Sequence, residues 1–272
     1  MHTCNAPRLD ARLAAAYDFV RPGHAAADIG CDHGKLSAAL AGSGRCPLVL
    51  ACDLRPGPLE KARVTCAPYG DKVQCRLGSG LSVLEPGEVD DIIIAGMGAE
   101  TIIEILEAAP WVFDARYNLV LVPATKHSIL RRWLARRGFA LRAETLCQAA
   151  GRWYAVMNAQ YTGAVREPDG LFCLTGLTNG QPGCSEYYAV QNEKLKSTAW
   201  VCRRGRKRGC RKTDCGIGAF VQAVMNHLRT TVTATAARGL AALQAPGTVI
   251  CRERFIPPGH VAYIARLLSA AL

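Results

Sequence analysis

The sequence predicts an α/β fold in which a doubly wound, mainly parallel sheet is followed by a smaller, mainly α-helical region. Short apolar runs alternate with helical patterns from about Leu9 to Gly163, and such alternation is typical of a sheet covered by helices on both faces. The strand runs are nearly free of polar residues, as expected for strands buried on both sides. The 272 residues, half of them hydrophobic, suffice for one sizeable core and a small appendage.

The individual elements follow from periodicity and from turn residues. Leu9, Leu13, Ala16 and Val20 recur at helical spacing, which predicts a lead-in helix that ends before the Arg-Pro-Gly sequence at 21–23. The expected parallel strands are Ala25–Ile29, Leu48–Asp53, Val73–Leu77, Asp91–Ala95 and Leu119–Val122. The expected helices between and after them are Lys35–Ala41, Pro58–Ala67, Glu100–Ala109 and Ile129–Arg137. An antiparallel pair, Phe139–Leu146 and Trp153–Tyr161, completes this first domain.

The composition changes after Gly163. Residues 1–163 are expected to form the first domain and residues 164–186 a linker or irregular loop, since Glu167–Gly183 is rich in proline and glycine. Residues 187–272 are expected to be basic and partly helical, with helices over Tyr187–Val201 and Phe220–Leu243.

The charge of the chain is concentrated in its last part. Residues 165–272 hold 15 Lys and Arg against 6 Asp and Glu, which favours a polyanionic partner such as nucleic acid. The basic stretch Cys202–Cys215 could contact several phosphates, or be a disordered basic loop. Its cysteines, Cys202, Cys210 and Cys215, lack the paired spacing of a zinc site. With no apolar run long enough to span a membrane and scattered, odd-numbered cysteines, we expect a cytoplasmic protein with free thiols.

The sequence from Asp28 to Gly34 follows the first strand and precedes its helix. A tight glycine-containing turn at this place lets backbone N–H groups approach a ligand closely, so we interpret it as a nucleotide-binding turn. It lacks the three glycines of the dinucleotide fingerprint, which favours a ligand that offers an amino acid end rather than a pyrophosphate, although NAD stays open. His33 either faces the substrate or is a helix-start residue bonded locally.

Two further strand ends carry candidate binding residues. Asp53, at the end of the second strand, is placed to accept hydrogen bonds from both hydroxyls of a ribose, or else to cap the helix near Pro56. Gly78-Ser79-Gly80, after the third strand, would lie beside an adenine, or be only a turn.

Ala95-Gly96-Met97-Gly98 follows the fourth strand, where an acceptor should meet the reactive end of a bound cofactor, and its small residues leave room for both. The segment has no Asn/Asp-Pro-Pro-aromatic motif for methylation of an exocyclic amine. The chain also has no Pro-Cys pair for attack on cytosine C5. A ring nitrogen therefore fits better as the acceptor.

With these motifs in view, the chain resembles the bacterial tRNA (adenine-N1)-methyltransferases that act on adenine 22. The resemblance covers about Leu9 to Tyr161, with order and spacing kept throughout. The matching stretches are 9–13 (LDARL), 27–33 (ADIGCDH), 53–59 (DLRPGPL), 76–81 (RLGSGL) and 94–98 (IAGMG).

This resemblance implies a Rossmann-like, seven-stranded class I methyltransferase domain that uses S-adenosyl-L-methionine (SAM), followed by a helical domain that helps to hold tRNA. The residues then expected at the cofactor are Asp28, Gly30, Cys31, Asp53, Leu54, Gly78, Ser79, Gly80, Ala95, Gly96, Met97 and Gly98. Those expected at the reaction are Asp32, as base or cation stabiliser, His33, and Arg12, as a phosphate ligand. The expected partner is tRNA, with no metal and no membrane, and the sequence is compatible with a monomer.

Several positions depart from the family pattern. Ser79 stands where the family usually has Asp, Ala99 replaces a second glycine, Lys35-Leu36-Ser37 lacks the usual Leu-Pro, and Val122-Pro123-Ala124-Thr125 replaces Gln-Pro-Asn. From about Cys202 the sequence lacks the Glu/Lys/Leu pattern of a helical pair, as a translated frameshift would explain. Two alternatives therefore stay open: a methyltransferase with another RNA or small-molecule acceptor, and a non-catalytic RNA-binding protein with a decayed site.

Overall fold

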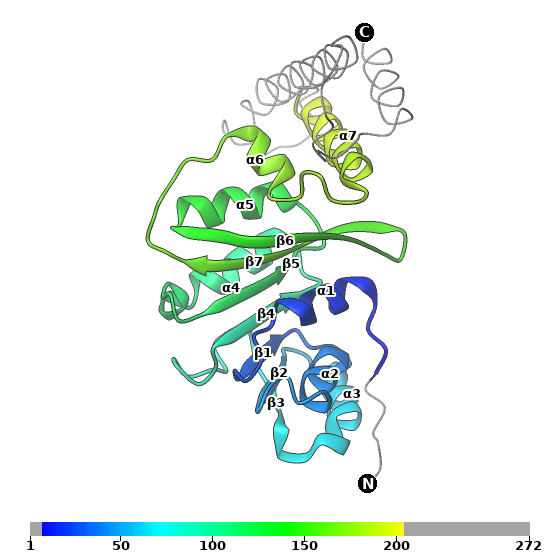
Figure 1. The fold of residues 1–272 in the computed structure, drawn as a ribbon, viewed down its shortest axis with the longest axis vertical. Coiled ribbons are helices and arrows are strands. Elements are labelled where there is room, and N and C mark those ends of the chain that lie inside the picture. The colour runs from blue at the N-terminus through cyan, green and yellow to red at the C-terminus, as the bar shows by residue number, and fades with distance from the viewer. Residues whose placement is uncertain (1–6, 204–272) are drawn as a thin grey trace, which may run out of the picture. The chain divides into compact units, whose positions relative to one another are not determined.

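The computed structural model describes residues 7–203, which contain a seven-stranded sheet with helices on both faces (Figure 1). The strands are β1 (Ala26–Ile29), β2 (Val49–Asp53), β3 (Val73–Leu77), β4 (Asp91–Ala95), β5 (Asn118–Val122), β6 (Phe139–Ala149) and β7 (Arg152–Tyr161). The helices are α1 (Ala11–Phe19), α2 (Lys35–Gly42), α3 (Pro56–Cys66), α4 (Ala99–Glu107), α5 (His127–Arg136), α6 (Gly170–Thr175) and α7 (Cys184–Arg203). Short 3₁₀ helices cover Ala67–Lys72 and Pro110–Val112.

The strand order is β3-β2-β1-β4-β5-β7-β6, with the first five parallel and β7 antiparallel to both of its neighbours. The chain winds outward from β1 to β3 and then returns to begin again at β4. The topological switch point therefore lies between β1 and β4, where ligands of doubly wound sheets bind at the carboxyl ends of the strands. The predicted fold class is confirmed, and each strand begins and ends close to its predicted limits.

Alternate residues of the strands feed two separate apolar cores, as the two-residue period of a strand requires. One core contains Ile29, Ile92 and Ile94 together with the buried faces of α4 and α5. The other contains Ile93 and Val120 together with α1 and α2. Because both faces are covered, the central strands β1, β2, β4 and β5 are apolar except at or next to their ends.

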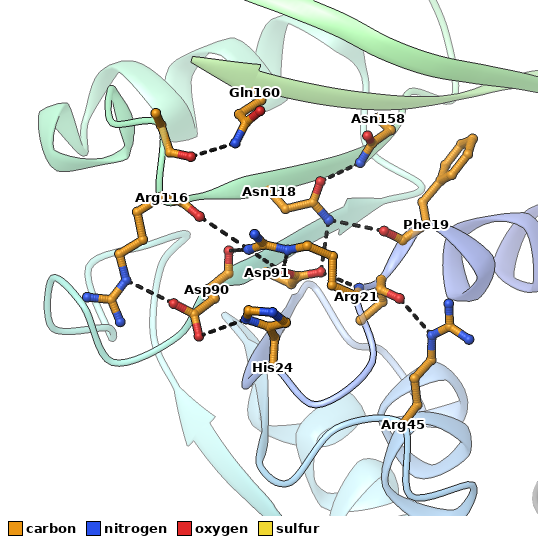
Figure 2. Close-up of polar contacts among 12 residues, drawn as sticks. Phe19, Arg21, His24, Arg45, Asp90, Asp91, Arg116, Asn118, Asn158 and Gln160 are labelled. Carbon is orange, nitrogen blue, oxygen red and sulfur yellow. Dashed lines mark hydrogen bonds and ion pairs between the residues drawn. The ribbon is translucent and has the colours of Figure 1, made fainter. Parts of the chain in front are cut away.

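A polar network ties the amino ends of β4 and β5 to the segment that follows α1 (Figure 2). The fully buried Asp91 carboxylate accepts hydrogen bonds from the backbone N and the Nε of Arg21, both at 2.7 Å, and from Asn118 Nδ2 at 2.8 Å. Asn118 Nδ2 also donates to the carbonyl of Phe19, and Asn158 donates to Asn118 Oδ1. The network thus fixes the lead-in helix and β7 against the centre of the sheet.

The segment expected to be a linker or irregular loop contains a short helix. Helix α6 begins after Asp169, whose side chain accepts the N–H of Phe172, and it ends at Gly176. Cys173 and Leu174 are buried. The glycines and prolines there border a helix that packs on the domain, and do not form a free linker. Helix α7 also starts earlier than expected, at Cys184.

The chain divides into two compact units, residues 1–191 and 192–272. The helix expected over Phe220–Leu243 lies outside the described residues, as does nearly all of the basic stretch Cys202–Cys215.

Candidate active site

A cavity of about 870 Å³ opens at the carboxyl ends of β1 to β4, at the switch point of the sheet. This volume is within the usual range for small-molecule sites, roughly 300–1,000 Å³. The walls come from the start of α1, the turns after the four strands, and the middle of α4. Segments that are distant in sequence therefore converge on one ligand-sized space.

The turn after β1 is held in shape by β2. The backbone N–H groups of Gly30 and Cys31 both donate to the carbonyl of Cys52, at 2.8 and 3.0 Å. Gly30 has a φ of +74°, a backbone conformation that favours glycine, and a Cβ there would also displace the Cε of Met97, 2.3 Å away. Asp32 also has a positive φ, 51°, and its N–H donates to Asp53 Oδ2 at 3.1 Å.

Asp28, at the end of β1, is a buried carboxyl group that faces the cavity. Burial raises its pKa to about 6, although the hydrogen bond from Ser37 Oγ at 2.7 Å opposes this rise. A carboxyl group in this state gains from a cationic ligand, because the cation would favour its charged form.

Asp53, at the end of β2, is 5% exposed. Its Oδ1 accepts from the N–H of Arg55 at 2.9 Å and its Oδ2 from Asp32 N. The N-cap residue of α3 is Arg55, with no side-chain capping bond, so the capping alternative for Asp53 is wrong. Each carboxylate oxygen has a second lone pair, and the pair of oxygens suits two ribose hydroxyls.

Arg12, Asp32 and His33 all line the cavity. The Arg12 guanidinium lies against Gly96, where a Cβ would come within 3.0 Å of Nη1, and 5.7 Å from the ring centre of Tyr154. Asp32 Oδ2 is 3.4 Å from His33 Nδ1.

Asp10 holds Arg12 in place. Its carboxylate caps α1 by accepting from Leu13 N at 3.0 Å, and it accepts from Arg12 Nε at 3.1 Å. Burial alone would raise the pKa of Asp10, but these bonds from Leu13 and Arg12 hold it below its ordinary value. Arg12 is therefore anchored at Nε, and its Nη1 reaches Gly96.

Every residue that the sequence assigned to the cofactor or to the reaction lines this cavity except Gly98. Gly98 is instead the N-cap residue of α4 and pairs with Thr125 in a short bridge, so it shapes the turn without forming the wall. Leu54 lines the cavity with 65% of its surface exposed.

Sequence reasoning missed several residues of the cavity wall, among them Asp10, Lys35, Arg55, Thr101, Glu104 and Ile105. The signals available were weak, since Thr101 and Glu104 read as ordinary helix residues. With them, the wall holds five acidic side chains, Asp10, Asp28, Asp32, Asp53 and Glu104, against three basic ones, Arg12, Lys35 and Arg55. The excess of acids favours a ligand that carries positive charge, such as a sulfonium.

Among the described residues, no helix is long and apolar enough to cross a membrane, and no group of three His, Cys, Asp or Glu side chains is placed to hold a metal ion. The side chains of Cys202, Cys210 and Cys215, considered above for zinc, lie outside that part of the chain.

Comparison with known proteins agrees with this geometry. A model of the methyltransferase domain matches residues 9–157, so the fold and the site define a class I SAM-dependent methyltransferase. A tRNA (adenine(22)-N(1))-methyltransferase of Bacillus subtilis is 30% identical over 188 residues, which are 68% of this chain and 79% of that protein. The chain belongs to the tRNA (adenine(22)-N(1))-methyltransferase family.

Solved structures support the same assignment. The crystal structure of the B. subtilis m1A22 tRNA methyltransferase TrmK matches with a TM-score of 0.65 and 25% identity, covering 82% of this chain and 98% of that one. A Streptococcus pneumoniae protein described as a candidate tRNA (m1A22) methyltransferase, crystallised with SAM, matches with a TM-score of 0.66 and 25% identity. That match covers 80% of this chain and 99% of the other.

Proposed function

We propose that this protein transfers the methyl group of SAM to N1 of adenine 22 in tRNA. The observation that carries the proposal is the acid-rich cavity at the switch point, with Asp53 at the end of β2 and an open turn of small residues after β4. Family membership supports the choice of tRNA and of the adenine ring nitrogen.

The residues of the chain fit SAM in three places. Asp53 binds the ribose hydroxyls, Asp28 and the turn after β1 bind the amino acid end, and Leu54 with Gly78-Ser79-Gly80 borders the adenine. When bound, SAM supplies an electrophilic methyl group on its sulfonium. The turn from Ala95 to Gly98 leaves room beside that group for the acceptor base.

The protein contributes alignment and electrostatics to the reaction. The protein would hold adenine N1, which is unprotonated near neutral pH, in line with the methyl group that bound SAM would supply, because the rate depends on alignment of the reacting groups. The product base carries positive charge, and Asp32 either stabilises this charge or accepts a proton lost from N6. Arg12 binds a phosphate next to the target, and His33 faces the substrate.

The tRNA must present its base to the cavity. Exposing adenine 22 from its stack costs a few kcal/mol, which contacts elsewhere on the RNA must offset. We assign that holding role to residues 187–272, joined to the catalytic domain 1–163 by residues 164–186. The enzyme acts in the cytoplasm, and it acts as a monomer. Light scattering of the full chain with and without tRNA would test the oligomeric state.

The decisive experiment is transfer of labelled methyl from SAM to tRNA by the full chain, followed by nucleoside mass spectrometry. A matched tRNA with guanine at position 22 is the control. Label in 1-methyladenosine that depends on adenine 22 is the expected result. A different methylated nucleoside, or SAM binding without transfer to tRNA, points to another acceptor. Loss of both binding and transfer indicates a non-catalytic RNA-binding protein.

A further inference from the structure

A buried ion pair joins α5 to β6 and to the segment around α6. The side chains of Arg131 and Glu144 are both fully buried, and Arg131 Nε donates to Glu144 Oε1 at 2.8 Å. Arg131 Nη1 donates to the carbonyls of Cys173 and Leu174, at 3.0 and 2.8 Å. A buried charge with this many partners is compensated, and removal of any partner is costly.

The ion pair continues into a chain of hydrogen bonds through Tyr187, in the first turn of α7. Arg131 Nη2 donates to the Tyr187 hydroxyl at 3.0 Å. The oxygen of this hydroxyl lies 2.9 Å from His127 Nδ1. His127 Nε2 is 3.0 Å from the carbonyl of Pro123. Because a carbonyl only accepts, Nε2 carries the proton, and Nδ1 of the neutral ring accepts from the Tyr187 hydroxyl.

Two observations agree with this direction of the bonds. Burial raises the pKa of Tyr187 to about 12, against the opposing effect of Arg131, so the hydroxyl keeps its proton at neutral pH. A neutral imidazole also avoids a second positive charge beside the buried Arg131. The rings of His127 and Tyr187 are stacked, with centres 5.7 Å apart.

Pro123 belongs to the loop between β5 and α5, and this loop supports the turn after β4. Ala124 N donates to the carbonyl of Met97 at 2.8 Å, and Ala99 N donates to the carbonyl of Thr125 at 3.3 Å. Met97 lines the cavity on the side assigned to the acceptor. A continuous path of polar contacts therefore runs from Tyr187 to the wall of the active site.

The connection between α6 and α7 leaves little freedom for Tyr187 to move. A Cβ on Gly176 would lie 1.9 Å from Glu144 Oε2, and one on Gly183 would lie 2.0 Å from Cη2 of Trp153. Both glycines have a positive φ, 57° and 76°. Close packing at both ends of the connection thus holds the first turn of α7 against α5.

We propose that Tyr187 is a positioning residue for methyl transfer, which through His127 and Pro123 sets the turn after β4 against which the acceptor base lies. The inference rests on the proposed function. It makes the base of α7, the helix that runs on to Arg203, part of the catalytic geometry on the acceptor side. The three cofactor contacts proposed above, at Asp53, at Asp28 and at Leu54 with Gly78-Ser79-Gly80, belong to β1 to β3 and the turns after them, which have no part in this path.

The test compares Tyr187→Phe with Tyr188→Phe in the full chain. Tyr188 is the next residue of the same turn, but its hydroxyl bonds Thr178 Oγ1 at 3.1 Å and has no part in the path to Pro123. For Tyr187→Phe we expect kcat at saturating tRNA to fall about tenfold, since small misplacements of reacting groups have effects of this size or larger. SAM affinity by calorimetry should change less than about twofold. Equal kcat values for the two variants would overturn the proposal.

Amide hydrogen exchange gives a readout that does not depend on the acceptor. Exchange at Ala124 and Ala99, whose N–H groups join the two loops, should be about tenfold faster in Tyr187→Phe than in Tyr188→Phe. Unchanged exchange overturns the positioning role even if the wild type methylates another substrate. Conversely, suppose that the wild type fails to methylate tRNA but the amides of Ala124 and Ala99 exchange faster in Tyr187→Phe. That result would refute the proposed function and leave the positioning role standing.

A pair of variants at His127 tests the path itself. His127→Gln keeps an amide that can donate to the Pro123 carbonyl and should retain kcat within about threefold, whereas His127→Leu should behave like Tyr187→Phe. If both variants keep full kcat, the path does not position the turn.

Discussion

The two ends of the parallel strands use aspartate in opposite ways. At the amino ends, Asp91 begins β4 with no exposed surface, and three protein donors satisfy its carboxylate (Figure 2). At the carboxyl ends, Asp28 and Asp53 finish β1 and β2 and face a cavity. The donors that Asp53 has are backbone N–H groups of the turns that form the wall.

The difference separates stability from function. A carboxylate whose partners are all protein groups contributes to folding, and a ligand can add nothing to it. A carboxylate with remaining lone pairs toward a cavity is destabilising unless a ligand completes it. The comparison predicts that substitutions at the amino ends change the free energy of unfolding, whereas those at the carboxyl ends change SAM affinity.

The largest expected effect is that of Asp91→Ala on stability. The change leaves the Arg21 side chain, which is 35% exposed, and the buried Asn118 amide without their shared acceptor, so we expect a loss of about 3 kcal/mol, the lower end of the cost of breaking a buried pair. Urea unfolding measures this loss in the free energy of unfolding. Asp90→Ala is the matched control, since the exposed pairs of Asp90 with Arg116 and His24 contribute less than about 1 kcal/mol. If Asp90→Ala and Asp91→Ala lowered the free energy of unfolding equally, the buried carboxylate of Asp91 would have no special role in stability.

The next effect is that of Asp53→Ala on SAM binding. Hydrogen bonds from ribose hydroxyls to a carboxylate contribute about 1.5–3 kcal/mol each, so loss of two bonds at the low end of this range should raise the Kd roughly 100-fold. Calorimetry measures the Kd, and Asp53→Asn, which keeps one acceptor oxygen, should lose only about tenfold. If the Asp53→Ala variant binds SAM normally but unfolds at a lower urea concentration, Asp53 contributes to stability, as Asp91 does, and not to SAM binding.

The pH dependence of Asp28 sharpens the comparison further. Because its folded pKa is about 6, above the ordinary value of 3.8, its contribution to stability is present below about pH 4 and is lost as pH rises to about 6. SAM binding has the opposite sign, since a cationic ligand favours the ionised carboxylate. Affinity should be full above pH 6 and fall up to about tenfold per pH unit below it.

Two variants check this assignment by calorimetry between pH 5 and 7. Asp28→Asn should remove the pH dependence of SAM binding. Ser37→Ala removes a hydrogen bond that lowers the pKa, so the midpoint should move to higher pH. A wild-type affinity that is flat over this range would show that Asp28 does not contact the charged end of the cofactor.

The sequence predicted the sheet well because buried parallel strands are unbroken apolar runs, and the turn residues after them are local signals. The sequence also predicted the acids near the ends of β1 and β2, because Asp28 and Asp53 interrupt runs of apolar residues at the places where these strands end. Helix α6 was missed because glycine and proline around residues 170–176 suggest a loop when their packing partners are unknown.

Tertiary pairings were beyond the sequence. Arg131 and Glu144 read as surface charges of a helix and a strand, yet both are fully buried against each other. Similarly, nothing local shows that Thr101 and Glu104 are on the face of α4 that lines the cavity, because the orientation of that face depends on packing. Residues that act through long-range contact need the structure.

The smallest expected effect is a gain at the carboxyl end. Ser79 lines the cavity with an exposed side chain at the place where the family usually has Asp, and its own carbonyl is bonded to Ser82. Ser79→Asp should bind SAM roughly three- to tenfold more tightly, the effect of about one added hydrogen bond to the adenine amine. Calorimetry should be done with SAM and with an analogue whose purine has a carbonyl in place of the amine. The comparison separates the hydrogen bond to the amine from the general attraction between the new carboxylate and the positively charged ligand. A gain confined to SAM supports adenine at this wall. An equal gain for both ligands would mean that charge alone acts there, and no change would mean that the adenine lies elsewhere in the cavity.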